Sequence, residues 1–138
     1  IDWGCDGITT NVTNNSFGQG TNNTQILDSL CPESNFAARW CNDLLVGGYD
    51  DWFLPNYQEA ILVDPSVYFD FTSITNNNAW NMWLSEEFAP NPNPYNYNCP
   101  SCSSSNNAWT LNYIGGYDVQ ANLKNSSSTG KVIAFRKF

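Results

Sequence analysis

The first half of the chain alternates polar stretches with short segments whose apolar residues recur at helical spacing. Asn22 or Asn23 is expected to cap the first helix, and Pro32 ends it. Its apolar stripe consists of Ile26, Leu27 and Leu30. Ser34 or Asn35 is the expected cap of a second helix, which the Gly47-Gly48 pair closes. The stripe of this second helix consists of Phe36, Ala37, Trp40, Cys41, Leu44 and Leu45.

A third helix is predicted by Asn56 and Glu59, which have the spacing of a capping box. The helix ends before Asp64-Pro65. The stretch from Tyr49 to Leu54 in front of it is too short and too aromatic for a helix. We expect this stretch to be a strand or extended turn that places Trp52 in the core.

From residue 66 onward the pattern changes to short, alternating strands separated by polar loops. A Gly115-Gly116 turn is expected to join two of these strands as a hairpin. The predicted strands are Trp80–Leu84, Ala108–Ile114 with Trp109, Leu111 and Tyr113 on one face, Tyr117–Leu123, and Lys131–Phe138. Helices followed by a meander predict an α+β fold, and 138 residues suit a single domain, 1–138.

Composition narrows the range of functions. Charged residues make up 13% of the chain and the net charge is −8, so a polyanion such as nucleic acid would be repelled. No apolar run is long enough for a membrane span, and membrane insertion is not expected. Aromatic residues reach 15%, enough for a core that needs no cofactor. Glycoside hydrolysis would require two carboxylates that face each other, and no such pair is marked, so no enzymatic activity is expected.

The surface is rich in Asn, Ser and Thr in place of charge, and two interpretations stay open. Such a surface serves solubility and salt tolerance. Amide and hydroxyl groups beside aromatic rings are also the chemistry that sugars prefer.

Five Cys and no His argue against a zinc site and against a Cys-His nucleophile. Disulfides formed outside the cytoplasm are the expected use of these residues. Cys99 and Cys102 are predicted to pair as a small staple. Cys31 and Cys41 flank the turn between two helices and are expected to pair, which leaves Cys5 over; pairing of Cys5 with either of them is the competing arrangement.

The segment from Ala89 to Ser105 is a long loop of Pro, Asn and Cys, too irregular to be a mere connector. Core packing accounts for Trp80 and Trp83 just before it. It accounts poorly for Tyr95 and Tyr97, whose neighbours are Pro and Asn, and exposed aromatic loops are usual binding sites. The predicted ligand contacts are Tyr95, Asn96, Tyr97, Asn98 and, from the preceding strand, Trp83. No metal site is predicted.

The string Gly48-Tyr49-Asp50-Asp51-Trp52-Phe53-Leu54-Pro55-Asn56-x-x-Glu59 resembles the C-terminal domain family of the Legionella collagen-like adhesin. Weaker matches follow in the same order over nearly the whole chain, among them Trp3-Gly4-Cys5, Trp83-Leu84-Ser85-Glu86 and Val132-x-x-x-Arg136-x-Phe138. The resemblance implies a C-type-lectin-like domain with two or three N-terminal helices and a twisted antiparallel sheet of short strands. It also implies homotrimers or assembly on a fibre.

One departure from the family changes the expected ligand. The family often ends in a Val-Arg-x-Val-Arg pattern, whereas Ile133 stands here where the first Arg would be. Members of the family that bind sulfated polysaccharide rely on positive charge, and this chain has a net charge of −8. The resemblance therefore implies adhesion, but binding of heparin-like ligands is not expected. We therefore expect an extracellular or cell-surface recognition domain, or one on a virion surface, that binds a glycan or a host or neighbouring surface protein. The alternative is a structural subunit of a filament, pilus or virion that makes protein–protein contacts only.

Overall fold

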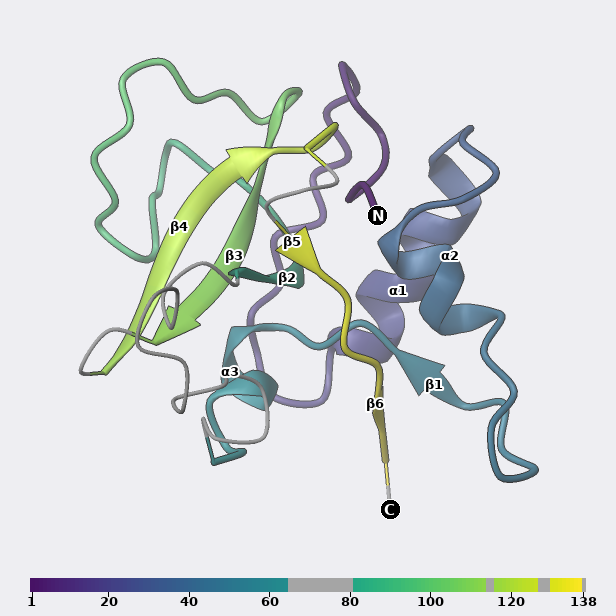
Figure 1. Cartoon of the computed structure of the whole chain (residues 1–138). Helices are drawn as coiled ribbons and strands as arrows, with labels where there is room; N and C mark the ends of the chain where they lie inside the picture. Colours follow the sequence, from purple (N-terminus) through teal and green to yellow (C-terminus); the bar gives the residue numbers. More distant parts are fainter. Residues whose placement is uncertain (65–80, 114–115, 127–129, 138) are drawn as a thin grey trace, which may run out of the picture.

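Helices come first and strands follow in the computed structural model, which describes residues 1–64, 81–113, 116–126 and 130–137. The predicted α+β class is confirmed: α1 and α2 lie side by side on one flank, and a curled four-stranded sheet lies on the other (Figure 1). The elements are α1 (Gly20–Leu30), α2 (Ala37–Asn42), β1 (Trp52–Phe53), α3 (Tyr57–Ala60), β2 (Asn81–Glu87), β3 (Asn107–Tyr113), β4 (Tyr117–Leu123), β5 (Gly130–Lys131) and β6 (Phe135–Arg136).

The start of α1 differs from the prediction. The N-cap residue is Gln19, which makes no side-chain capping bond, and neither Asn22 nor Asn23 serves as the cap. Asn23 is buried inside the helix, where its amide nitrogen Nδ2 donates to the carbonyl of Asn14 at 2.8 Å and to Ser85 Oγ at 3.1 Å. Tertiary hydrogen bonds thus occupy a side chain that local rules assign to a cap. The end of α1 at Cys31, before Pro32, is as predicted.

The second helix is shorter than predicted, and Phe36 takes its N-cap position in place of Ser34 or Asn35. A side-chain cap is not needed because the Ala37 N–H, in the first turn, donates to the Asp2 carbonyl at 2.9 Å. By contrast, the capping box of α3 is confirmed. The Glu59 N–H donates to Asn56 Oδ1 at 3.1 Å, and the Asn56 N–H donates to Glu59 Oε1 at 2.9 Å.

The four-stranded sheet has the order β4-β3-β2-β5, so β2 lies inside it and is buried on both faces. The predicted hairpin is present as the antiparallel pair β3–β4, with Tyr113 opposite Tyr117, while Gly115 lies outside the described residues. The predicted strand 131–138 is instead divided. β5 pairs parallel with β2, and β6 pairs antiparallel with β1 in a separate two-stranded sheet. Trp80 and Phe138 also lie outside the described part of the chain.

The core consists of two clusters, one on each face of the four-stranded sheet. Trp83 of β2 belongs to the cluster that faces α1, α2 and the N-terminal segment, and Met82 and Leu84 belong to the other. Trp109, Leu111 and Tyr113 share the second cluster, as their alternation predicts. The expectation for Trp52 was wrong: in β1 the buried side chain is that of Phe53, and Trp52 is half-buried.

An ion pair closed off from solvent joins the N-terminal segment to the sheet. Lys124 Nζ donates to Glu87 Oε2 at 2.8 Å and to the Ile8 carbonyl at 2.7 Å, and the exposed fractions of the two charged side chains are 0% and 1%. The same carboxylate oxygen accepts the N–H of Thr10 at 2.7 Å. Burial lowers the pKa of Lys124, and the neighbouring Glu87 opposes that shift. These contacts satisfy a charge pair that would be costly to bury otherwise.

Two cysteine pairs meet as disulfides. Cys99 pairs with Cys102, as predicted, and Cys5 pairs with Cys31. The expected Cys31–Cys41 pair is therefore replaced by the competing arrangement. Cys41, in α2, is a free thiol that is fully buried in the cluster that faces the helices. Cys31, at the end of α1, instead contacts the N-terminal segment. Burial raises the pKa of Cys41 to about 12, so this thiol is not an active nucleophile.

Candidate functional site

A groove of about 540 Å³ lies where the long loop, the start of α3 and the start of β4 meet. We call it the tyrosine groove, because four half-buried Tyr side chains line it. Amide-bearing residues and one acidic residue, Asp118, also line it. The described lining residues are Asn15, Tyr57, Gln58, Pro94, Tyr95, Asn96, Tyr97, Asn98, Tyr117, Asp118 and Val119.

The long loop is held in shape by its own hydrogen bonds. Its ends are joined where the Phe88 N–H donates to the Asn107 carbonyl at 3.1 Å, as β2 and β3 come together. In its middle, Asn93 Nδ2 donates to the Tyr97 carbonyl at 2.7 Å, and Asn93 Oδ1 accepts the N–H groups of Tyr95 and Tyr97. Asn96, at the tip of this turn, has a φ of 54°, a conformation that Asn tolerates well. The loop therefore has a defined conformation before any ligand arrives.

Tyr95 and Tyr97 have a core to enter, which contradicts the view that nothing in the protein accounts for them. Both rings meet the edge or face of Trp109, which projects from β3, at ring-centre distances of 5.0 and 6.0 Å. Tyr95 also lies 5.0 Å from the ring of Tyr57. One part of each ring is thus packed and the other part lines the groove. Removing either ring would cost stability as well as surface for a ligand.

Glu86 of β2 accepts hydrogen bonds from two residues that line the groove, Tyr57 and Tyr95. The Tyr95 hydroxyl donates to Glu86 Oε1 and accepts a hydrogen bond from Asn15 Nδ2 at 3.4 Å. The second carboxylate oxygen of Glu86 accepts the Tyr57 N–H at 2.8 Å. Burial raises the pKa of Glu86 to about 7, the two hydrogen bonds oppose this shift, and the charge of Glu59 adds to it.

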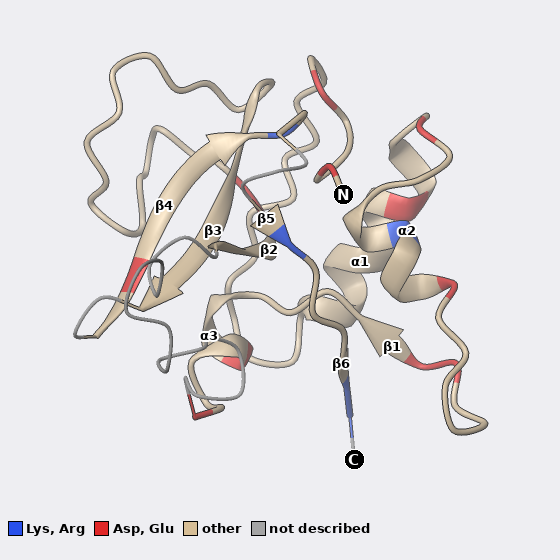
Figure 2. Ribbon diagram, in the orientation of Figure 1, with Lys and Arg blue, Asp and Glu red and all other residues tan. Residues whose placement is uncertain are grey.

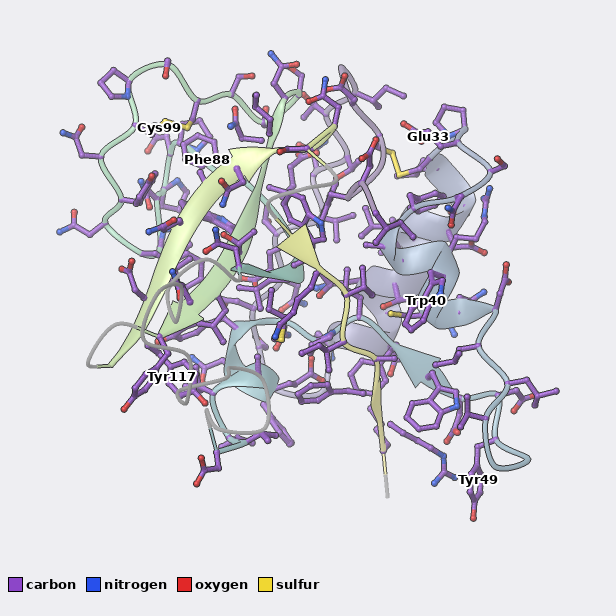
Figure 3. The ribbon with its side chains drawn as sticks, viewed as in Figure 1. Glu33, Trp40, Tyr49, Phe88, Cys99 and Tyr117 are labelled. Atoms are coloured by element: carbon purple, nitrogen blue, oxygen red, sulfur yellow. A yellow bond between two sulfur atoms is a disulfide. The ribbon has the colours of Figure 1, made fainter. Side chains whose placement is uncertain are left out.

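β4 supplies another part of the groove lining. The Tyr117 ring packs edge-on against Tyr113 at 5.3 Å, and its hydroxyl donates to the Val63 carbonyl after α3. Figure 3 shows Tyr117 on the flank that also carries Cys99, away from Trp40 and Tyr49. The next residue, Asp118, is exposed, and its Oδ2 accepts a hydrogen bond from Gln120 Nε2 at 3.2 Å.

Four of the five predicted ligand contacts come together in this groove, namely Tyr95, Asn96, Tyr97 and Asn98. Trp83 does not. Its side chain is fully buried on the other face of β2, and its indole N–H donates to the Ile1 carbonyl at 3.0 Å, so no ligand can reach it. Sequence reasoning missed the groove residues that lie outside the loop, which are Asn15, Tyr57, Gln58, Tyr117, Asp118 and Val119. Gln58 could have been noticed as a polar residue in the first turn of a well-capped helix. Its neighbours in the sequence, however, do not connect it to the loop.

One group of potential metal ligands occurs in the described ranges. The sulfurs of Cys5 and Cys31 and the carboxylate of Glu33 lie within 4.8 Å of one another. The two sulfurs are bonded to each other, whereas metals bind the thiolate. Glu33 accepts the N–H groups of Cys5 at 3.1 Å and Asp6 at 3.3 Å. The carboxylate thus stabilises the turn that carries the disulfide.

A second groove, of about 560 Å³, is mainly apolar and lies between α3 and β6. Phe53 and Phe135 form its base, and Phe17 and Leu62 stand exposed at its rim. It lacks the amide groups that surround the tyrosine groove.

Among the helices that the structure describes, none combines the length and the apolar character needed to cross a bilayer. Comparison of the chain with protein-family models, curated proteins and solved structures finds no match.

Proposed function

We propose that this chain is a non-catalytic, extracellular or cell-surface recognition domain that binds a glycan in the tyrosine groove. The observation that carries the proposal is the alternation of half-buried Tyr rings with exposed carboxamides on one rigid wall. Sugars present apolar C–H faces and hydroxyl groups together. A site for them needs flat apolar surface beside groups that both donate and accept hydrogen bonds, which Tyr and Asn supply.

The order of the loop supports binding. The Asn93 hydrogen bonds and the Cys99–Cys102 disulfide limit the conformations of the segment that carries Asn96 and Asn98. A ligand then loses less affinity to the ordering of the protein. Tyr side chains add contact area at a small loss of conformational entropy.

The placement of acidic groups favours recognition over catalysis. Hydrolysis of a glycosidic bond requires two carboxyl groups on opposite sides of that bond. Among the described lining residues, Asp118 is the one carboxylate. Glu86 lies behind the Tyr95 ring and is used by the Tyr95 hydroxyl and the Tyr57 N–H.

Membership of the collagen-like adhesin C-terminal domain family, and with it a C-type-lectin-like arrangement, is part of the same proposal. The Gly48 to Glu59 motif supports it. This string spans β1 and the capping box of α3, and α3 carries Tyr57 and Gln58 into the groove. The motif thus shapes one wall of the proposed site.

The test is a glycan array with the intact domain, followed by calorimetric titration of any ligand found. Asn98→Ala and Gln58→Ala remove one exposed carboxamide each from the groove. Each should weaken binding about five- to tenfold, the cost of about one hydrogen bond. Asn22→Ala and Gln25→Ala are the matched controls, because both side chains are exposed on α1 outside the groove. The proposal fails if no glycan binds, or if the groove variants bind as tightly as the controls.

The alternative, a structural subunit that makes only protein–protein contacts, is favoured by one observation. The turn after α2 exposes large apolar side chains, with Leu45 at 70%, Val46 at 51% and Tyr49 at 49%. Trp40 and Tyr49 lie on the flank away from Tyr117 (Figure 3). Light scattering over a concentration series tests this reading. A monomer at all concentrations would exclude self-assembly through that turn, and a Leu45→Ser variant would show whether any assembly depends on it.

A further inference from the structure

The groove between α3 and β6, which we call the apolar groove, combines an apolar lining with a single available positive charge. We propose that it binds a fatty acid, with the hydrocarbon chain on the Phe rings of the groove and the carboxylate at the ammonium group of Lys137. This is a second ligand site, beyond the proposed glycan site and independent of it. The position of Lys137 at the rim of a mainly apolar groove carries the proposal.

The base of the apolar groove is formed by the two-stranded sheet. Phe53 of β1 and Phe135 of β6 are opposite each other in the register, so both side chains project from the same face. Their rings meet edge-on with centres 6.3 Å apart. Phe17 and Leu62, each 69% exposed, extend this apolar surface to the rim. A hydrocarbon chain that lies in the groove would remove this surface from water.

Few polar groups of the lining are able to bind a ligand. The described lining contains no Asn, Gln, Ser or Thr. The carboxylate of Glu59 is buried, and its two oxygens accept the N–H groups of Asn56 at 2.9 Å and Gly20 at 3.4 Å. A sugar or a peptide would therefore bury several hydrogen-bonding groups without partners, which is costly. A hydrocarbon chain has no such groups, so this lining favours it.

Lys137 supplies the charge at the rim. Its Nζ donates to the carbonyl of Gly18 at 3.1 Å, and Gly18 lines the groove beside Phe17, so the ammonium group lies next to the lining. An ammonium group has three donors, and this neutral carbonyl takes one of them. The others are directed to no carboxylate in the described part of the chain, and a carboxylate is their strongest partner. Figure 2 shows the basic positions of β6 and of the chain beyond it.

Arg136, the other cation among the described lining residues, is already used elsewhere. Its Nε donates to the carboxylate of Asp51, and its guanidinium lies 3.4 Å from the centre of the Tyr49 ring. Neither Asp51 nor Tyr49 is among the described lining residues, so the guanidinium points away from the groove. This agrees with the strand geometry, in which Arg136 and its neighbour Phe135 project to opposite faces. Lys137 is therefore the cation that an anionic ligand can reach.

The rest of the protein does not attract an anion. The net charge of the chain is −8, and the buried carboxylate of Glu59 repels a second carboxylate from the floor of the groove. The acid group of the ligand is thus expected at the rim, and its methyl end on the rings. Any preference for an acid over an uncharged molecule of the same length must come from the local contact with Lys137.

The experiment is calorimetric titration of the intact domain with decanoate, decanol and decylammonium, in near-neutral buffer and below the concentrations at which these molecules aggregate. The three probes share one chain length and differ in the charge of the head group. Decanoate should bind about fivefold more tightly than decanol, and decylammonium should bind most weakly. Lys137→Gln should reduce the preference for decanoate to within about twofold and leave the affinity for decanol unchanged. Lys137→Arg, which keeps the positive charge, should retain most of the preference.

A second pair of variants tests the location of the site. Leu62→Ser should weaken the binding of decanoate and of decanol alike by about fivefold, because it removes apolar surface from the rim. Leu45→Ser is the matched control, since Leu45 is 70% exposed and is not among the described lining residues. Both side chains are largely exposed, so both variants should keep the melting temperature of the wild-type protein.

Every other outcome overturns the proposal. Decanol or decylammonium binding as tightly as decanoate would exclude an acid-selective site, and an unchanged preference in Lys137→Gln would exclude the contact with Lys137. Equal losses in Leu62→Ser and Leu45→Ser would place the ligand outside the apolar groove. If no probe binds, the fatty-acid proposal is wrong, and the glycan array still decides separately on the tyrosine groove.

Discussion

Replacing Glu86 by Gln should remove most of the pH dependence of stability between about pH 4.5 and pH 7. The carboxyl group of Glu86 is 1% exposed, and burial raises its pKa from 4.5 to about 7. In the folded protein it therefore holds its proton over a range in which the unfolded chain has released it. The folded state binds more protons there, so the free energy of unfolding falls as the pH rises through this window.

The expected size follows from the two pKa values. The difference between 4.5 and about 7 corresponds to about 3 kcal/mol, at roughly 1.4 kcal/mol for each tenfold change in proton affinity. Stability is highest below pH 4.5 with respect to this group and is lowest once the pH exceeds 7. For a domain of this size, the loss lowers Tm by about 10 °C. The chain has no His, so no imidazole titrates in the same range.

Urea unfolding at several pH values from about 4.5 to about 8 measures this effect. Gln is the right substitution because it is neutral at every pH and resembles the protonated carboxyl group: its amide oxygen can accept the Tyr57 N–H, and its amide nitrogen, in the position of Oε1, can donate to the Tyr95 hydroxyl oxygen. Asp43→Asn is the control for the loss of one acidic group, since Asp43 is exposed. The reasoning is refuted if the wild-type protein shows no decline over this range, or if Glu86→Gln declines as steeply as the control.

Two further predictions concern the core and the disulfides. Lys124→Met should destabilise the fold by about 3–5 kcal/mol in urea unfolding, because it leaves a buried carboxylate without its partner; a loss below about 1 kcal/mol would mean that water reaches that site. Replacing Cys5 and Cys31 by Ser should cost about 3 kcal/mol, and replacing Cys99 and Cys102 about half as much, because the first bond closes a much longer segment of chain. Equal losses would show that the length of the closed segment is not what matters.

Features that depend on neighbouring residues could be predicted from the sequence. The Asn56–Glu59 capping box is complete within four residues, and it is present in the structure. The alternation of Trp109, Leu111 and Tyr113 likewise needs no partner to be recognised, and all three belong to one cluster.

Features that depend on distant residues could not be predicted. Asn23 is a good capping residue by local rules, but Asn14 and Ser85 take up its side chain. Tyr95 and Tyr97 look unsupported among Pro and Asn, because the indole on which they pack comes from β3. The same limit applied to the disulfides, since spacing alone left the partner of Cys31 open. For the candidate site, the sequence indicated the loop and its four contacts, whereas the walls from α3 and β4 required the fold.

Exposure alternates along the middle of the long loop: from residue 93 to residue 100, each odd position is half-buried and each even position is exposed. Asn93, Tyr95, Tyr97 and Cys99 hold the loop in place, and Asn96 and Asn98 face outward. The residues that hold the loop in place and the residues that face outward therefore occupy different positions. Descendants of this sequence could exchange an outward residue such as Asn98 to recognise a new ligand, whereas the φ of 54° at Asn96 favours Asn or Gly and restricts replacement there. A library randomised at position 98 with Asn96 kept constant would keep the contacts that hold the loop and vary the surface offered to a ligand.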